Sequence, residues 1–209
     1  MNRWVRRGLL GAAVLVGVIV VGNVLIVGSY FVAARTVDVT TVPDVQGVGN
    51  LAVVDDHVWR GANPSREGMR SLAEAGVTTV VDLRPDGEQD DDLVRSLGMR
   101  PVDIYVPDGQ TPSDDDIDRF LRVVRESDGT VFLHCSSGVG RSGVMAAAYL
   151  ARTAGDSGPS MALTNLAIGP SSLEQIWYAA RGADHHPNPL VVGLSRFIDG
   201  PRQLLNRFG

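Results

Sequence analysis

The chain has 209 residues, enough for one domain with a hydrophobic core and an additional segment. Its formal net charge of -5 argues against a nucleic-acid-binding protein, which normally presents a basic face. A single cysteine excludes an intramolecular disulfide and a cysteine-rich metal cage. All 19 basic residues are arginine, so one arginine taken alone says little about phosphate recognition.

The first segment is long and apolar. After the basic start MNRWVRR, residues 8–34 contain no charged residue. A helix needs about 20 apolar residues to cross a bilayer, whereas the apolar region of a cleavable signal peptide is usually about 7–15 residues. We therefore predict an uncleaved transmembrane helix, with cleavage near FVAAR as the alternative.

The arginines that flank this segment indicate its orientation. Arg3, Arg6 and Arg7 precede it and only Arg35 follows closely. The positive-inside rule then predicts a single-pass membrane protein with its N-terminus in the cytoplasm and its main domain outside. We expect residues 1–35 to form a cytoplasmic stub and membrane anchor, residues 36–50 a linker, and residues 51–209 a catalytic domain.

Strand and helix patterns alternate from residue 51 onward. Short apolar or β-branched runs predict strands, and amphipathic runs with capping residues or glycine stops predict helices. The predicted strands are two short ones within 51–61, then 77–83, 99–106 and 130–134; the predicted helices are 66–76, 88–97, 113–127, 141–153 and 171–182. This order predicts an α/β fold with a central, mostly parallel sheet flanked by helices on both faces.

The stretch HCSSGVGRSG (134–143) lies between a predicted strand and a predicted helix. Its five small or apolar residues allow the backbone to curl so that successive N–H groups face one anion, and the helix N-terminus adds positive potential. Arg141 adds a planar fork for two phosphate oxygens. We therefore expect the substrate phosphate to be bound by Ser136, Ser137, Gly138, Val139, Gly140 and Arg141.

Cys135 is the candidate nucleophile. A thiol at a helix N-terminus beside a guanidinium is favoured as the thiolate, which can attack a bound phosphate. Ser142 can donate a hydrogen bond to the sulfur when it leaves in a second step. A buried, inert cysteine is the alternative, but it does not explain the Cys-x5-Arg-Ser spacing.

HCSSGVGRSG resembles the His-Cys-x5-Arg-Ser/Thr signature of the cysteine-dependent protein tyrosine phosphatase superfamily. VWRGANPSREGMRSLAEAGVTTVVDLRP and PDGQTPSDDDIDRF are similar to compact, atypical dual-specificity phosphatases, and the resemblance covers residues 58–154. It implies two-step phosphomonoester hydrolysis through a cysteinyl-phosphate, with no metal and no cofactor.

The resemblance also implies a general acid, which maps best onto Asp108 in the loop VPDGQTPS. Asp103 in the preceding strand is the alternative, while residues 114–116 read as acids of a helix first turn. His134 is expected to orient the loop by hydrogen bonding rather than to act as a base. Gln175 resembles a water-positioning glutamine, although a solvated helix residue is equally consistent with the sequence.

The substrate stays open between a phosphorylated protein and a phospholipid or phosphoinositide. A catalytically weak module that binds phosphorylated ligands at the membrane is a further alternative, as is a sulfur-transfer or redox protein using the lone thiol. A thiolate outside the cell is open to oxidation, so either side of the membrane remains possible for the domain.

Overall fold

The computed structural model describes residues 3–85, 87–155 and 158–206, with side chains up to residue 202. A five-stranded sheet in the order β1-β2-β5-β3-β4 lies at its centre, and all neighbouring strands are parallel except β1 and β2. The α/β class and the mostly parallel sheet predicted from the sequence are confirmed. The elements in chain order are α1 (Arg3–Thr36), β1 (Ala52–Val53), β2 (Val58–Ala62), α2 (Arg66–Glu74), β3 (Val77–Asp82), α3 (Asp91–Ser96), β4 (Arg100–Asp103), α4 (Asp114–Glu126), β5 (Thr130–Cys135), α5 (Arg141–Thr153), α6 (Gly158–Ile168), α7 (Leu173–Ala180) and α8 (Pro189–Asn206).

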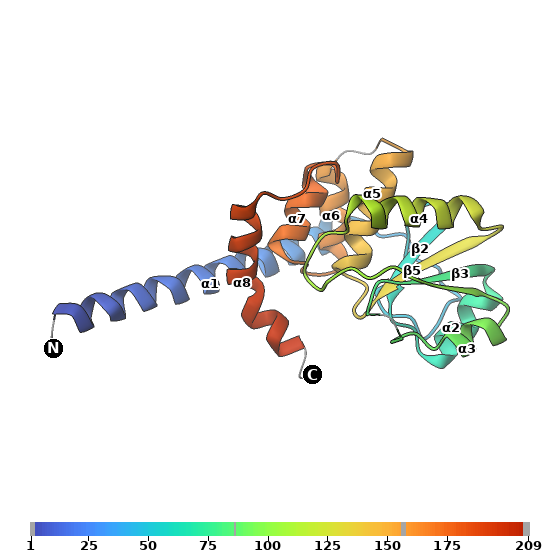
Figure 1. Ribbon diagram of the computed structural model, residues 1–209, viewed down its shortest axis with the longest axis horizontal. Helices are drawn as coiled ribbons and strands as arrows, with labels where there is room; N and C mark the ends of the chain where they lie inside the picture. Colours follow the sequence, from blue (N-terminus) through green and yellow to red (C-terminus); the bar gives the residue numbers. More distant parts are fainter. Residues whose placement is uncertain (1–2, 86, 156–157, 207–209) are drawn as a thin grey trace.

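Helices cover both faces of the sheet (Figure 1). On one face α2 and α3 pack around Leu72, Val80 and Phe132. On the other face α4 and α5 enclose a larger core that includes Phe120, Met145 and residues of α6 and α7. Because β5 contributes alternate side chains to both cores, its carboxyl end is held firmly in the middle of the sheet.

Local sequence signals fix several helix ends where they were expected. Ser65 and Ser113 accept hydrogen bonds from the first turns of α2 and α4, and Ser113 forms a capping box with Asp116. Gly76 and Gly98, which follow α2 and α3, have positive φ angles of 93° and 79°. Several elements are shorter than predicted; for example, α3 begins only after its N-cap Asp90 and β4 ends at Asp103.

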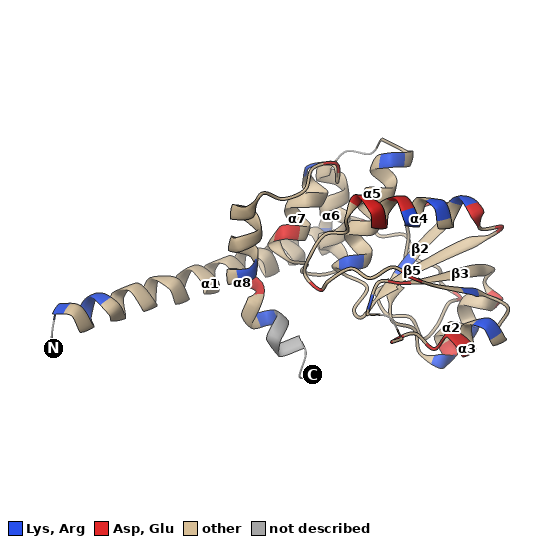
Figure 2. Ribbon diagram, viewed as in Figure 1, with Lys and Arg blue, Asp and Glu red and all other residues tan. Residues whose placement is uncertain are grey.

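The N-terminal helix has a free part and a packed part. Residues 3–18 are all exposed and project from the domain (Figure 1), whereas the second half contacts α6 and α8. Asn23 Nδ2 donates to the Ile198 carbonyl at 2.8 Å, and Ile26 and Ala33 are buried on the same side of the helix. After its first turns α1 carries no charge until Arg35 (Figure 2), and it is long and apolar enough to cross a membrane.

Residues 36–50, predicted as a linker, pack on the domain. Val45 is buried against the α2–α3 side of the sheet. The carbonyls of Thr40, Gly47 and Gly49 accept hydrogen bonds from backbone amides of the domain. This segment is therefore an ordered outer layer of the domain, because its backbone groups are satisfied by the fold rather than by solvent.

Candidate active site

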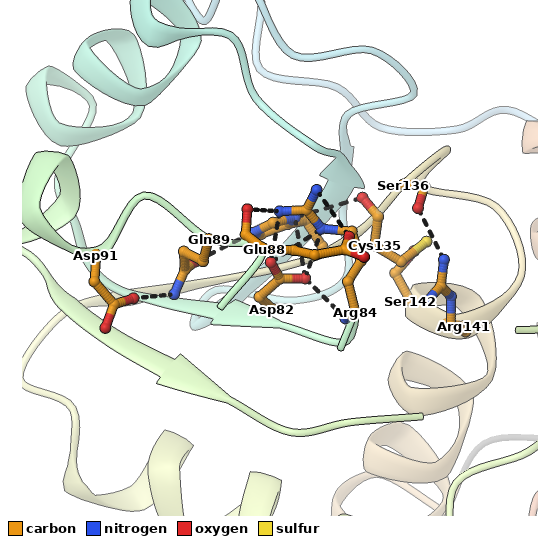
Figure 3. A network of polar contacts seen from close by, with 10 residues as sticks. Asp82, Arg84, Glu88, Gln89, Asp91, Cys135, Ser136, Arg141 and Ser142 are labelled. Carbon is orange, nitrogen blue, oxygen red and sulfur yellow. Dashed lines mark hydrogen bonds and ion pairs between the residues drawn. The ribbon is translucent and has the colours of Figure 1, made fainter. Parts of the chain in front are cut away.

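The stretch singled out in the sequence forms a loop between the central strand and a helix. Cys135 is the last residue of β5, Gly140 is the N-cap of α5, and Arg141 is its first residue. The N-cap has no side-chain hydrogen bond, so the first amides of α5 are available to an anion. Figure 3 shows Cys135, Ser136, Arg141 and Ser142 gathered at this point.

The loop is held in shape by β2 and by the segment before it. Gly138 has a φ of 73°, and a Cβ there would collide with the backbone of Gly61 and Ala62. Asn63 N donates to the Ser136 carbonyl at 3.1 Å, and Asn50 Nδ2 donates to the Ser137 carbonyl at 2.8 Å. These bonds leave the loop amides, rather than its carbonyls, free to face a ligand.

Arg141 connects the loop to the acidic residue predicted from the sequence. Its Nη2 donates to Ser136 Oγ at 2.9 Å, and its Nε lies 3.3 Å from Asp108 Oδ1. The contact between Nε and Asp108 is an ion pair, but its geometry is not that of a hydrogen bond. The Arg141 side chain is 7% exposed and the Asp108 side chain is 52% exposed. A buried guanidinium therefore contacts a carboxylate that is half exposed to solvent.

Cys135 and Ser142 also lie together. Both residues are buried, and the two side-chain atoms Sγ and Oγ are 3.7 Å apart. That separation is within reach of a hydroxyl-to-sulfur hydrogen bond. The structure thus brings Cys135, Arg141, Asp108 and Ser142 around one loop.

His134 lies behind the loop in a buried polar network (Figure 3 shows its neighbours). Its Nε2 is 3.2 Å from Gln89 Oε1, and its Nδ1 is 3.4 Å from the Cys135 carbonyl. Burial lowers the pKa of His134 to about 4, more than the nearby Asp82 carboxylate raises it. The ring is therefore neutral near pH 7 and suited to holding the backbone of Cys135.

Asp82 and Arg84 form a buried, bidentate ion pair next to this network, with Nη2–Oδ2 at 2.7 Å. Burial by itself would lower the pKa of Arg84, but the hydrogen bonds and charge of Asp82 outweigh it and raise that pKa. The pair fixes the conformation of the turn that follows β3. This turn lies next to the loop that carries Cys135.

A small pocket of about 70 Å³ opens beside the loop, between Asp108 and the start of α7. Gln175 lines it, and this residue is buried: its Nε2 donates to the Gln110 carbonyl at 3.0 Å and its Oε1 accepts from Ser172 N. The alternative that Gln175 is a solvated helix residue is therefore wrong, because the capping box of α7 turns the side chain inward.

The pocket also has a residue that the sequence did not suggest. Arg202 of α8 lines it, donates to the Ser171 carbonyl at 2.9 Å, and pairs with Asp199 at 2.6 Å. Asp199 is fully buried and accepts from Leu173 N and from Ser195 Oγ. Nothing local in the sequence marks these residues, because they reach the loop only through the packing of α8 on α7.

Comparisons with known proteins agree with this geometry. The model of the PTP-NADK family, described as a DSP-PTPase phosphatase fused to NAD+ kinase, matches residues 37–175. The probable chloroplastic NAD kinase 2 of Oryza sativa subsp. japonica is 33% identical over 114 residues, which are 51% of this chain and 11% of that protein. The human dual-specificity protein phosphatase CDC14A is 38% identical over 53 residues, 25% of this chain and 9% of that one. The chain therefore spans about a tenth of the length of these two relatives.

A solved structure shares the fold over nearly its whole length. TpbA of P. aeruginosa superimposes with a TM-score of 0.58 at 22% identity, covering 78% of this chain and 98% of TpbA. At this identity the likeness speaks for the fold, which is the one expected from the strand–loop–helix arrangement.

Proposed function

The chain belongs to the PTP-NADK family, and from that premise we propose that it is a membrane-anchored phosphatase that hydrolyses phosphomonoesters through a cysteinyl-phosphate. At the coarser level it is a phosphatase of the cysteine-dependent protein tyrosine phosphatase superfamily, of the compact dual-specificity type. The observation that carries the finer proposal is the convergence of Cys135, Arg141 and Asp108 on one anion-binding loop.

The proposed reaction has two steps. In the first, Cys135 Sγ attacks phosphorus, the ester P–O bond breaks, and Asp108 gives its proton to the departing oxygen. In the second, water attacks the phosphorus, Asp108 takes the water proton, and the P–S bond breaks. Arg141 and the loop amides neutralise the equatorial oxygens in both steps, and Ser142 donates to the sulfur as it leaves.

Position favours Asp108 over Asp103 as the general acid. Asp103 is the last residue of β4, and β3 lies between β4 and β5. Two strand spacings of about 4.8 Å therefore separate its backbone from that of Cys135. Asp108 lies in the loop that follows, with its carboxylate against Arg141.

The membrane part of the proposal rests on the helix length and on what surrounds it. The exposed and uncharged residues 8–18 span about 17 Å at 1.5 Å per residue, less than the hydrocarbon core of about 30 Å. A bilayer around α1 would thus reach α6 and α8. Those two helices carry exposed, large apolar side chains, namely Leu163, Leu190, Leu194 and Phe197.

This arrangement supports a phosphorylated group at the membrane surface as substrate. Arg202 lines the pocket from α8, the same helix that presents Leu190 and Leu194 outward. A phospholipid headgroup is therefore the second candidate beside a phosphorylated protein. The N-terminal arginines favour a domain outside the cell, as the positive-inside rule predicts.

The test is hydrolysis of an aryl phosphate by the full chain in a neutral detergent. We expect turnover by the wild type and complete loss of turnover in Cys135→Ser. When the wild-type reaction with a phosphate-labelled substrate is quenched with acid, labelled phosphate should stay attached to the protein. Arg66→Met, at an exposed arginine on α2, is the control that should keep full activity. Activity that survives Cys135→Ser would contradict the mechanism, and phosphate binding without turnover would favour the binding module.

A further inference from the structure

Arg60 is a buried side chain on the same face of the sheet as Cys135. It lies in β2 opposite Leu133 of β5, and two residues further along Ala62 lies opposite Cys135. Side chains two residues apart in a strand point to the same face, which for Leu133 and Cys135 is the face covered by α4 and α5. The guanidinium reaches the first turn of α5, since a Cβ at Gly143 would lie 2.5 Å from Arg60 Nη1.

The start of α5 brings Arg60 close to the proposed nucleophile. Gly143, which makes room for the guanidinium, directly follows Ser142, and Ser142 Oγ lies 3.7 Å from Cys135 Sγ (Figure 3). Burial lowers the pKa of Arg60 to about 10, and the charge of Cys135 acts in the opposite direction. Arg60 is therefore still a cation at neutral pH, and its charge and that of the thiolate favour each other.

The fold gives Arg60 no counter-charge of its own. The residue is 2% exposed, and among the described residues neither Nη1 nor Nη2 has a hydrogen-bond partner. In the described part of the chain, no carboxylate is among the groups that shift its pKa. Burying an unpaired cation costs free energy, and buried charges in proteins are ordinarily paired. A role for the charge itself would explain why it is kept here.

The other titratable and charged groups around Cys135 are largely compensated. They are two arginine–aspartate pairs and one neutral histidine, namely Arg84 with Asp82, Arg141 with Asp108, and His134. In the proposed reaction Arg141 also binds the phosphate, so its charge is shared with the substrate. Arg60 keeps its full charge, because neither a described carboxylate nor the substrate neutralises it.

We propose that Arg60 is a positioning residue for the nucleophile: its fixed charge, held between β2 and the start of α5, stabilises the thiolate of Cys135. A cation acts more strongly on a nearby thiol when both are withdrawn from water. The thiolate is needed twice in the proposed reaction, as the attacking group and as the leaving group of the second step. The role rests on the proposed function in this respect.

The ionisation of Cys135 can be measured directly, because it is the only cysteine of the chain. The ultraviolet absorbance of the thiolate is followed against pH with the full chain in a neutral detergent. The spectrum of the same protein carrying Cys135→Ser is subtracted, which removes the absorbance change of the tyrosines. The proteins compared are wild type, Arg60→Met, Arg60→Gln, Arg60→Lys and the exposed control Arg66→Met.

We expect the titration midpoint of Cys135 to rise by about one pH unit in both Arg60→Met and Arg60→Gln, because the cation is gone. It should change little in Arg60→Lys, which keeps the charge, and in Arg66→Met. The two neutral variants differ in polarity but are similar in length to arginine, so an equal shift in both separates loss of charge from altered packing. Both should fold, since each removes an unpaired buried charge.

A midpoint that stays unchanged in the neutral variants overturns the proposal, as does an equal rise in Arg60→Lys. The titration needs no turnover, so its result is independent of the aryl phosphate assay. Absence of turnover in the wild type would contradict the proposed function, whereas absence of the shift would contradict the role of Arg60.

Discussion

Asp108 Oδ1 lies 3.3 Å from Arg141 Nε, so the proposed general acid contacts the same guanidinium that we propose as the phosphate-binding group. In the proposed reaction, a bound phosphate would compete with this carboxylate for the Arg141 guanidinium. The two residues therefore link substrate binding to the position of the acid.

The first prediction concerns Asp108→Asn. The amide cannot supply a proton, so we expect kcat for an alkyl phosphate to fall about 10²–10⁴-fold. Vanadate binding should tighten about twofold, because a competing half-exposed carboxylate is removed from Arg141. Asp114→Asn is the matched control, since Asp114 pairs with Arg152 on the surface of α4. Equal losses in both variants would contradict the role of Asp108.

The second prediction concerns Ser142→Ala. Loss of the hydroxyl 3.7 Å from Cys135 Sγ should slow the release of the thiolate in the second step, lowering kcat about 10–100-fold. The first step should be spared, so rapid-quench kinetics should show a burst of alcohol followed by a slow phase. A slow reaction without a burst would mean that Ser142 acts before the intermediate forms.

The third prediction compares two glycines. Gly138→Ala should destabilise the protein by about 2 kcal/mol more than Gly76→Ala, as measured by urea unfolding. Both positions have positive φ, but only Gly138 packs against the backbone of Gly61 and Ala62, whereas a Cβ at Gly76 meets nothing within 4 Å. Equal costs would show that the loop can shift away from β2.

The fourth prediction is a dependence of stability on pH. Burial lowers the pKa of His134 to about 4 from an unfolded value near 6.5, so the unfolded chain binds the extra proton between these values. The contribution of the neutral ring is complete above pH 6.5 and is lost as the pH falls toward 4, by up to about 3 kcal/mol.

Urea midpoints of wild type and His134→Gln at pH 7.5 and pH 5 check this dependence. The difference in urea midpoint between the two proteins should be smaller at pH 5. Only the wild type has a buried imidazole at residue 134 that must stay unprotonated when the chain folds. His185→Gln is the control, since His185 lies exposed beside Asp184. A constant difference across this range would mean that His134 is not held neutral.

The fifth prediction concerns the membrane. A fluorophore attached at Leu190→Cys, in a Cys135→Ser background, should be quenched by nitroxide lipids in phosphatidylcholine vesicles. The same label at Asp118→Cys on the exposed face of α4 should be quenched several-fold less. Equal quenching at both sites would contradict the proposed position of α8 at the bilayer.

Most of the fold and the centre of the site followed from local sequence. The run TVFLH predicts a buried strand, and the small residues before Arg141 predict a tight turn, because both depend on neighbours along the chain. The polar contacts of Asn50 and Arg202 could not be predicted, since they join the loop to segments that are distant in sequence.

Helix α8 joins the N-terminal helix to the pocket. Ile198 receives the side chain of Asn23 and packs on Gly22, while the adjacent Asp199 holds Leu173 and Arg202 at the pocket. Removal of the N-terminal helix is the usual way to obtain a soluble sample. It would expose the side of α8 that packs on this helix and weaken the support that α8 gives to the edge of the pocket. Rates measured on such a truncated protein would describe an enzyme whose pocket entrance has changed. The N-terminal helix should therefore be present in any preparation used to compare substrates.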